Sequence, residues 1–128
     1  MSILAKYIIS DTHFGDYDLH TKRGVITFER TQFNDIYEHD NFVQNMILNI
    51  AKKIKPGDEF WHLGDFGKLD NLAIIEAINS AGGISHFILG NHDAAADISK
   101  FEKYFQYVHQ YPVYLSKKLV LSHEPVGV

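Results

Sequence analysis

The chain has 128 residues, which suits one domain over residues 1–128 and leaves little room for a second. Hydrophobic residues make up 45% and charged residues 22%, which excludes a disordered chain, a collagen-like chain and a coiled-coil rod. The net charge of −4 does not indicate binding of nucleic acid through basic charge, and the lack of cysteine excludes disulfides and cysteine-held metal. No signal peptide or membrane helix is predicted, so we expect a soluble cytoplasmic protein without membrane partners.

Short apolar runs alternate with helical patterns along the chain. Strands are predicted at residues 7–10, 60–63, 86–89 and 119–122, with a less regular one, interrupted by Pro112, at 107–115. The order strand, helix, strand, helix, strand predicts a layered α/β domain with a mixed sheet flanked by helices.

Two helices are predicted between these strands, each from an apolar face at helical spacing. The face of the first comprises Phe42, Met46, Ile47, Ile50, Ala51 and Ile54, and Pro56-Gly57 ends that helix. The second presents Leu72, Ile75, Ala77 and Ile78, and Gly82-Gly83 ends it. A short third helix is predicted over residues 98–104.

Each of the four clear strands leads into residues that can bind a metal ion. They are followed by Asp11-Thr12-His13, Gly64-Asp65, Gly90-Asn91-His92-Asp93 and His123-Glu124. Ligands of open α/β sheets bind at the carboxyl ends of the strands, so these side chains should meet if the strands are parallel neighbours. Carboxylate, imidazole and amide oxygen suit Mn²⁺, Fe²⁺ and Zn²⁺. Two such ions about 3.5–4 Å apart can activate a water and hold a phosphoryl group.

This order of motifs resembles the signature of the calcineurin-like metallophosphoesterases. Asp-x-His and Gly-Asp are weak signals alone, but Gly-Asn-His-Asp after an apolar strand is specific, and all of them in order form a strong pattern. Further segments are similar to the small bacterial and phage members without a cap domain: Phe28-Glu29-Arg30, Glu38-His39-Asp40 and the run from His62 to Phe66. The resemblance covers nearly the whole chain and implies the α/β sandwich of that family.

The resemblance implies a centre with two divalent metal ions. Asp11 and His13 would bind the first ion, and Asp65 would bridge both. Asn91 and His123 would bind the second. Mn²⁺ is the expected metal, with Fe, Zn or Ni as alternatives.

The same resemblance implies hydrolysis of a phosphate mono- or diester. A hydroxide that bridges the two metals would attack phosphorus in line, without a phosphoenzyme. His92 would protonate the leaving oxygen as the general acid, and Asp93 would orient its ring. Arg30 is a candidate contact for the substrate phosphate, since guanidinium matches phosphate geometry, although a solvated arginine is an equal alternative.

One family element has no counterpart in this sequence. The pattern continues with Gly-His-x-His, whereas this chain ends at Val128 without it. We therefore expect a shortened member in which each metal keeps three protein ligands and carboxyl-terminal strands are missing. The alternative function is a scaffold that binds partners without catalysis, which the missing histidines favour and His92 opposes. Nucleic acid stays open as a substrate, because two bound cations would add positive charge locally.

The other five histidines are expected to have structural roles. His20, His39, His62, His86 and His109 are predicted to be surface residues or hydrogen-bonded core residues. Of these five, His62 lies two residues before Gly64 on a predicted strand, so it is the one that could contact the metal-binding residues without binding the metal itself.

Overall fold

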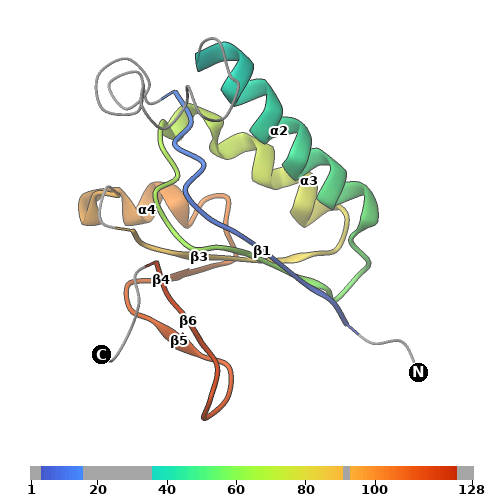
Figure 1. Cartoon of the computed structure of the whole chain (residues 1–128), viewed down its shortest axis with the longest axis vertical. Helices are drawn as coiled ribbons and strands as arrows, with labels where there is room; N and C mark the ends of the chain where they lie inside the picture. The colour runs from blue at the N-terminus through green and yellow to red at the C-terminus, as the bar shows by residue number, and fades with distance from the viewer. Residues whose placement is uncertain (1–3, 16–35, 91–92, 124–128) are drawn as a thin grey trace.

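The computed structural model describes residues 4–15, 36–90 and 93–123 (Figure 1). The elements of these ranges, with η marking 3-10 helices, are β1 (Lys6–Ile9), α2 (Ile36–Lys53), β2 (Glu59–His62), η2 (Leu69–Ile74), α3 (Ile75–Ser80), β3 (Ile84–Ile88), η3 (Ala95–Asp97), α4 (Ile98–Phe101), β4 (Tyr107–His109), β5 (Val113–Tyr114) and β6 (Val120–Leu121).

The first four strands form one parallel sheet in the order β1-β2-β3-β4. Their register aligns Ile8, Trp61, His86 and Tyr107 in a row across the sheet. Because every strand runs the same way, all four carboxyl ends lie at one edge, which is where open α/β sheets bind ligands.

The strand expected at residues 119–122 does not join this sheet. It forms β6, which pairs antiparallel with β5 in a separate two-stranded hairpin. Pro112 lies between β4 and β5, so the run expected at 107–115 is divided between the two sheets. The prediction of one mixed sheet was therefore wrong in this respect, because Pro112 lacks the N–H that a continuous strand would need.

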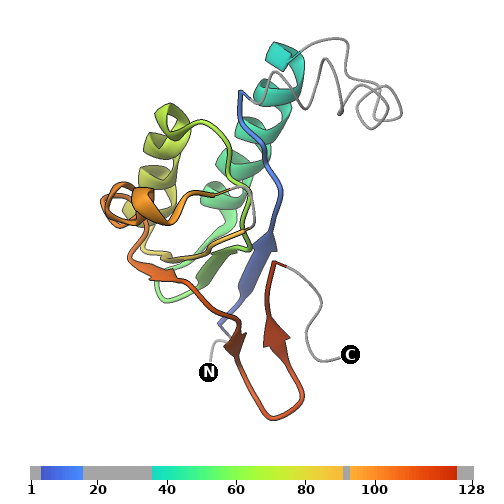
Figure 2. The ribbon, with the colours of Figure 1, turned by 90° about the vertical axis from the view of Figure 1, so that its left-hand side faces the viewer.

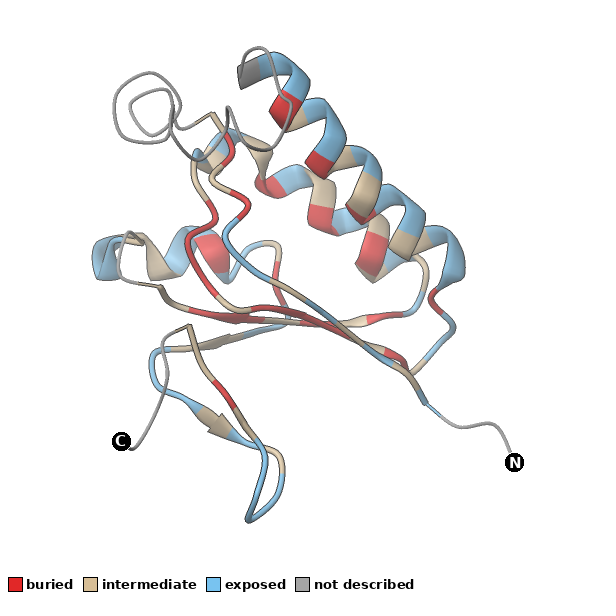
Figure 3. Cartoon of the chain, in the orientation of Figure 1, coloured by how far each residue is buried: buried red, intermediate tan, exposed pale blue. Residues whose placement is uncertain are grey.

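The helices cover one face of the sheet and the hairpin lies against the other, which we call the hairpin face (Figures 1 and 2). On the helix side, Phe60 and Phe87 are fully buried and pack with Ile47 of α2 and Ile75 of α3 in the main core. Figure 3 shows this buried band between the helices and the sheet. A smaller core on the hairpin face joins Trp61, Ile88 and Leu121.

Helix α2 buries most of the expected apolar face, with one correction. Ile47 and Ile54 are buried, and Met46 and Ile50 pack against the core. Phe42 is 57% exposed, however, and Val43 takes the buried position instead. The physical reason is the position of each residue around the helix. Val43 and Ile47 lie above the sheet, whereas Phe42 lies on the side of α2 that extends beyond β1, the edge strand of the sheet.

Of the other two predicted helices, the second is present over the expected residues and the third is shorter than the sequence indicated. The second begins as the 3-10 helix η2 and continues as α3, which together bury Leu72, Ile75 and Ile78 as expected. The third, α4, ends at Phe101, and Gly82-Gly83 follows α3 as predicted. Among the residues that the structure describes, no helix has the length and apolar character needed to cross a membrane.

Candidate metal centre

The pairing between β1 and β2 continues beyond the ends of both strands. The backbone N–H of Asp11 donates to the carbonyl of Gly64 at 2.9 Å, and that of His13 donates to the carbonyl of Asp65 at 3.0 Å. Phe14 then continues the series with a bond to Phe66 at 2.9 Å. The two loops therefore run side by side, and this fixes Asp11, His13 and Asp65 at the carboxyl edge of the sheet.

These three residues all have a left-handed backbone. The φ angles are 56° at Asp11, 44° at His13 and 56° at Asp65. Asp and His tolerate this region better than most residues, but each still costs roughly 1–3 kcal/mol. Such strain persists only where the surrounding structure fixes it, and it gathers at functional sites.

Two glycines allow the loops after β2 and β3 to approach closely. A Cβ atom on Gly64 would lie 2.6 Å from the Cα of Gly90, and a Cβ on Gly90 would lie 2.4 Å from Oδ1 of Asp65. Any larger residue would push the loops apart. The glycines before Asp65 and Asn91 are thus needed for the position of the Asp65 carboxylate.

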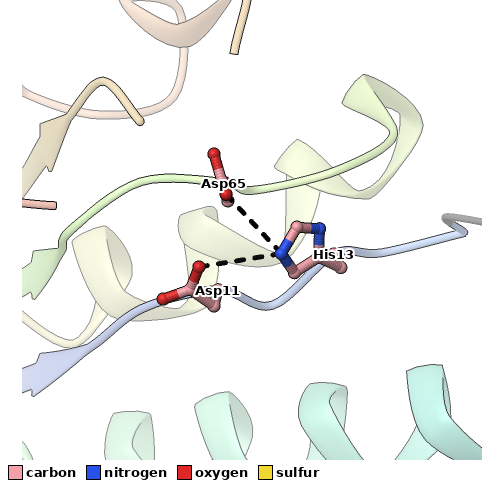
Figure 4. Close-up of side chains that lie close together, drawn as sticks. All are labelled: Asp11, His13 and Asp65. Atoms are coloured by element: carbon pink, nitrogen blue, oxygen red, sulfur yellow. Dashed lines mark ion pairs between the residues drawn. The ribbon is translucent and has the colours of Figure 1, made fainter. Parts of the chain in front are cut away.

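Asp11, His13 and Asp65 direct their polar atoms toward one point (Figure 4). Nε2 of His13 lies 3.6 Å from Oδ1 of Asp11 and 3.6 Å from Oδ2 of Asp65. These separations are too long for hydrogen bonds. Two atoms bound to one metal through bonds of about 2.0–2.2 Å are themselves roughly 3.0–3.6 Å apart. The three residues therefore fit a divalent cation, with Asp11 on the solvent side and Asp65 buried.

His123 adds a fourth potential ligand from the end of β6. Its Nδ1–H donates to the backbone carbonyl of Leu63 at 3.0 Å. In the neutral ring the lone pair is then on Nε2, which lies 3.2 Å from Oδ2 of Asp65. A backbone carbonyl that fixes the tautomer in this way is typical of histidines that bind metal.

A buried pair of polar side chains supports the loops from the core side. The N–H of Gly64 donates to Nδ1 of His62 at 3.0 Å, so Nε2 carries the proton and donates to Oγ1 of Thr12 at 2.9 Å. Thr12 in turn donates to the carbonyl of Phe66 at 2.8 Å. Burial lowers the pKa of His62 to about 3, so its ring is neutral and its hydrogen bonds are fixed. His62 is thus a hydrogen-bonded core residue beneath the site, as predicted.

Asp93 contacts the backbone of the loops after β2 and β3, and the expectation that it orients His92 stays a prediction. Its Oδ2 accepts from the N–H groups of Asp65 at 2.7 Å and Gly90 at 2.8 Å, and its Oδ1 accepts from that of Phe66 at 3.0 Å. Burial raises the pKa of this carboxyl, against the effect of these three donors. Asp93 therefore connects the loops after β2 and β3. The predicted partner, His92, lies outside the described residues.

Asp40 of α2 anchors the loop after β1. The N–H of Gly15 donates to both of its oxygens, at 3.1 and 2.9 Å, and Nδ1 of the buried His39 lies 3.0 Å from Oδ1. The first turns of α2 thereby hold the loop that carries Asp11 and His13.

The structure brings together four of the predicted site residues and places a fifth beside them. Asp11, His13, Asp65 and His123 converge, and Asp93 contacts the backbone of Asp65. Asn91, His92 and Arg30 lie outside the described residues. Sequence reasoning missed Thr12 and Asp40. For Thr12 the signal was its place between two predicted ligands. For Asp40 the signal was the family-like segment Glu38-His39-Asp40, from which no role for this residue was inferred.

Comparisons with known proteins bear on the fold and leave the chemistry open. No protein-family model matches the chain, and no curated protein matches it. The crystal structure of AQ665, a protein of unknown function from Aquifex aeolicus, is similar, with 27% sequence identity and a TM-score of 0.65. The match covers 96% of this chain and 62% of AQ665, so the chain spans about three fifths of the length of that protein. The chain thus has a layered α/β fold that a solved protein shares.

Proposed function

We propose that this protein is a metal-dependent phosphoesterase of the calcineurin-like kind, which hydrolyses a phosphate mono- or diester. One observation carries the proposal: Asp11, His13, Asp65 and His123 converge at the carboxyl edge of a parallel sheet. Three of them stand on left-handed backbone. A fold that needed these residues only as turn or surface groups would have no reason to hold this strain.

The position of Asp65 supports two neighbouring metal sites. Its Oδ2 lies 3.6 Å from Nε2 of His13 and 3.2 Å from Nε2 of His123. The same carboxylate thus lies close to two imidazoles, which follow two different strands. In the proposal, Asp11, His13 and Asp65 would hold one ion, while Asp65, Asn91 and His123 would hold the other. When bound, two divalent ions would activate a water and neutralise the oxygens of a phosphoryl group.

The remaining residues position the substrate side of the site. Asp11 has a side chain that is 48% exposed, so it marks the face from which a phosphate ester would enter. His92 is the proposed general acid. Asp93, the next residue in the sequence, accepts hydrogen bonds from three backbone N–H groups. Arg30 is the proposed contact for the phosphate.

The test is hydrolysis of p-nitrophenyl phosphate and bis-p-nitrophenyl phosphate by the purified chain, with Mn²⁺ and with a chelator. We expect turnover that requires Mn²⁺ and that Asp65→Asn and His92→Ala abolish. His109→Ala is the matched control, because it removes a histidine from the hairpin face and should leave the rate unchanged. The preferred ester distinguishes a monoesterase from a diesterase.

A negative result is informative if metal binding is measured in parallel. Mn²⁺ that binds and stabilises the chain, with no hydrolysis under Mn²⁺, Fe²⁺, Zn²⁺ or Ni²⁺, would overturn the enzymatic proposal and leave the scaffold. Turnover that persists in Asp65→Asn would also contradict it, since the shared carboxylate would then be dispensable.

A further inference from the structure

A chain of hydrogen bonds passes around Asp65 on the core side of the candidate centre. It begins at the N–H of Gly64, the residue before Asp65, which donates to Nδ1 of His62 at 3.0 Å. Nε2–H of His62 donates to Oγ1 of Thr12 at 2.9 Å, and Thr12 donates to the carbonyl of Phe66 at 2.8 Å. The chain therefore starts one residue before Asp65 and ends one residue after it.

Asp93 holds other backbone groups of the same segment. It accepts from the N–H groups of Asp65 and Phe66, and from the N–H of Gly90 in the loop after β3. The hydrogen bonds through His62 use two different groups, at the residues before and after Asp65, and connect them to the loop after β1. Asp93 and His62 thus fix the segment from two sides, one toward β3 and the other toward β1.

A neutral imidazole supplies both of the links that this place requires. Nδ1 of His62 must accept, because the N–H of Gly64 donates to it. Nε2 must carry a hydrogen, because Thr12 already donates its own hydroxyl hydrogen to a carbonyl. The neutral ring offers one acceptor and one donor at separate corners of a rigid plane, whereas an amide side chain carries both groups on one carbon.

The surroundings of His62 are those of an apolar side chain. The ring is fully buried, and the ring centroids of Phe66, Phe87 and Phe105 lie 5.4, 5.2 and 6.4 Å from its own. A phenylalanine would fill this space without the cost of burying two polar atoms. The polar atoms of the imidazole instead hold the residues on either side of Asp65, which packing alone would not explain.

We propose that His62 is a positioning residue for the shared carboxylate of the candidate metal centre. By fixing the residues before and after Asp65, it maintains the left-handed backbone of Asp65, whose φ is 56°. This conformation places Oδ2 of Asp65 3.6 Å from Nε2 of His13 and 3.2 Å from Nε2 of His123. His62 has this role only toward a bound metal, so the inference rests on the proposed function.

Loss of these hydrogen bonds should act on metal binding and not on the fold alone. Replacement of residues that orient metal ligands typically weakens metal binding by about 10- to 100-fold. His62→Phe fills the same space among phenylalanines but supplies neither hydrogen bond. We therefore expect it to bind Mn²⁺ roughly 10- to 100-fold more weakly than the native chain. Thr12→Val breaks the second link and should weaken binding as well.

Ser85→Ala is the matched control. Ser85 is fully buried, donates to Oδ1 of Asn79 at 2.7 Å and accepts from the N–H of Gln106 at 3.0 Å. The variant thus removes two hydrogen bonds of the core, near the amino end of β3 and at the end of the sheet opposite the candidate centre. It should lower the stability of the chain but leave its affinity for Mn²⁺ unchanged. A purely structural His62 would give the same result in His62→Phe.

Isothermal titration calorimetry with Mn²⁺ measures the affinity of each variant, at a temperature at which circular dichroism shows it to be folded. The double variant of His62→Phe and Thr12→Val should lose no more affinity than His62→Phe alone, because both act through one chain of hydrogen bonds. If His62→Phe does not fold, Thr12→Val and Thr12→Ser give the same comparison. Serine keeps the hydroxyl and should bind Mn²⁺ more tightly than valine does.

The outcomes separate this inference from the proposed function. Equal affinities of His62→Phe and the native chain would overturn the inference and leave the proposed function intact, as would an equal loss in Ser85→Ala. Mn²⁺ binding that depends on His62, in a chain that hydrolyses no ester, would support the inference and contradict the enzymatic proposal. A native chain that binds no Mn²⁺ would overturn both.

Discussion

The domain holds two pairs of histidines in contrasting surroundings. His13 and His123 lie at the candidate metal centre, on loops that follow strands. His86 and His109 lie on the hairpin face, inside regular strands, where Nδ1 of His86 and Nε2 of His109 form a hydrogen bond of 3.1 Å. Trp61 stacks on His86 with ring centroids 3.9 Å apart.

The difference is in what faces the ring nitrogens. Nε2 of His13 and of His123 point toward the carboxylate of Asp65. In the second pair the nitrogens satisfy each other, although Oε1 of Glu59 lies only 3.8 Å from Nε2 of His86. Imidazoles near a carboxylate are therefore not enough to indicate a metal site. The candidate centre is distinguished by the polar atoms of Asp11, His13 and Asp65, which converge on one point, and by the left-handed backbone of all three residues.

The largest expected effect is the loss of metal binding in Asp65→Asn. Mn²⁺ at 100 times its dissociation constant should stabilise the native chain by about 2.7 kcal/mol. Asp65→Asn should weaken binding roughly 100-fold or more, since it removes the carboxylate that two histidines share. Glu59→Gln, at the other histidine pair, should bind as the native chain does. Thermal unfolding with and without Mn²⁺ measures the stabilisation by the metal in each variant. If both variants lost the same amount of this stabilisation, the two histidine pairs would not differ in metal binding.

Backbone strain at the centre gives the next effect. Gly67 has a φ of 101°, and a Cβ there would lie 2.2 Å from the backbone N of Phe14. We expect Gly67→Ala to cost about 2.5 kcal/mol in urea unfolding. Gly15→Ala is the control, since its added Cβ meets only the flexible side chain of Lys68, and it should cost about 1 kcal/mol. Equal costs would show that the close approach of the two loops is unimportant.

The buried hydrogen bonds under the centre give a smaller effect. Thr12→Val keeps the shape of the side chain but leaves the buried Nε2–H of His62 without its acceptor, while the carbonyl of Phe66 still accepts from the N–H of Phe14. We expect a loss of about 2 kcal/mol in the free energy of unfolding. Thr12→Ser retains the hydroxyl and should lose less. If the two variants were equally stable, packing rather than hydrogen bonding would hold the loops.

Acid titration of the second histidine pair gives the smallest effect. Burial lowers the pKa of His86 from 6.5 to about 4, with a further contribution from His109. Between pH 4 and 6.5 the unfolded chain therefore binds more protons than the folded chain. The stability that neutral His86 contributes to the fold is fully present above about pH 6.5 and is lost as the pH falls toward 4. Partial exposure screens it, and we expect about 1 kcal/mol. His86→Phe should flatten the change in stability between pH 7.5 and 5; an unchanged slope would contradict this.

Local patterns predicted the strands and indicated residues of the candidate site, because both depend on nearby residues. The apolar runs located β1, β2 and β3, and the residue types after them indicated Asp11, His13 and Asp65. The path of the loops could not be predicted in the same way. The left-handed backbone and the contacts of Asp93 depend on how the loops after β2 and β3 meet, which no single segment determines.

The same limit explains two of the errors in the fold. Phe42 fits the helical spacing of α2, but its exposure follows from β1 being the edge of the sheet, a property of strand order. The hairpin of β5 and β6 was expected as a strand of the main sheet, since residues 119–122 have strand composition whichever sheet they join. Both the exposure of Phe42 and the sheet that residues 119–122 join depend on which strands pair, and those strands are far apart in the sequence.

The three bonds accepted by Asp93 also couple the centre to unfolding. Its carboxylate receives the amide hydrogens of Asp65 and Phe66 from one loop and of Gly90 from the other. Release of either loop therefore removes support from the other, so the two open as one cooperative unit. Their amide hydrogens should exchange with solvent deuterium together, and only after β2 separates from β3. The centre is thus assembled or lost in a single step.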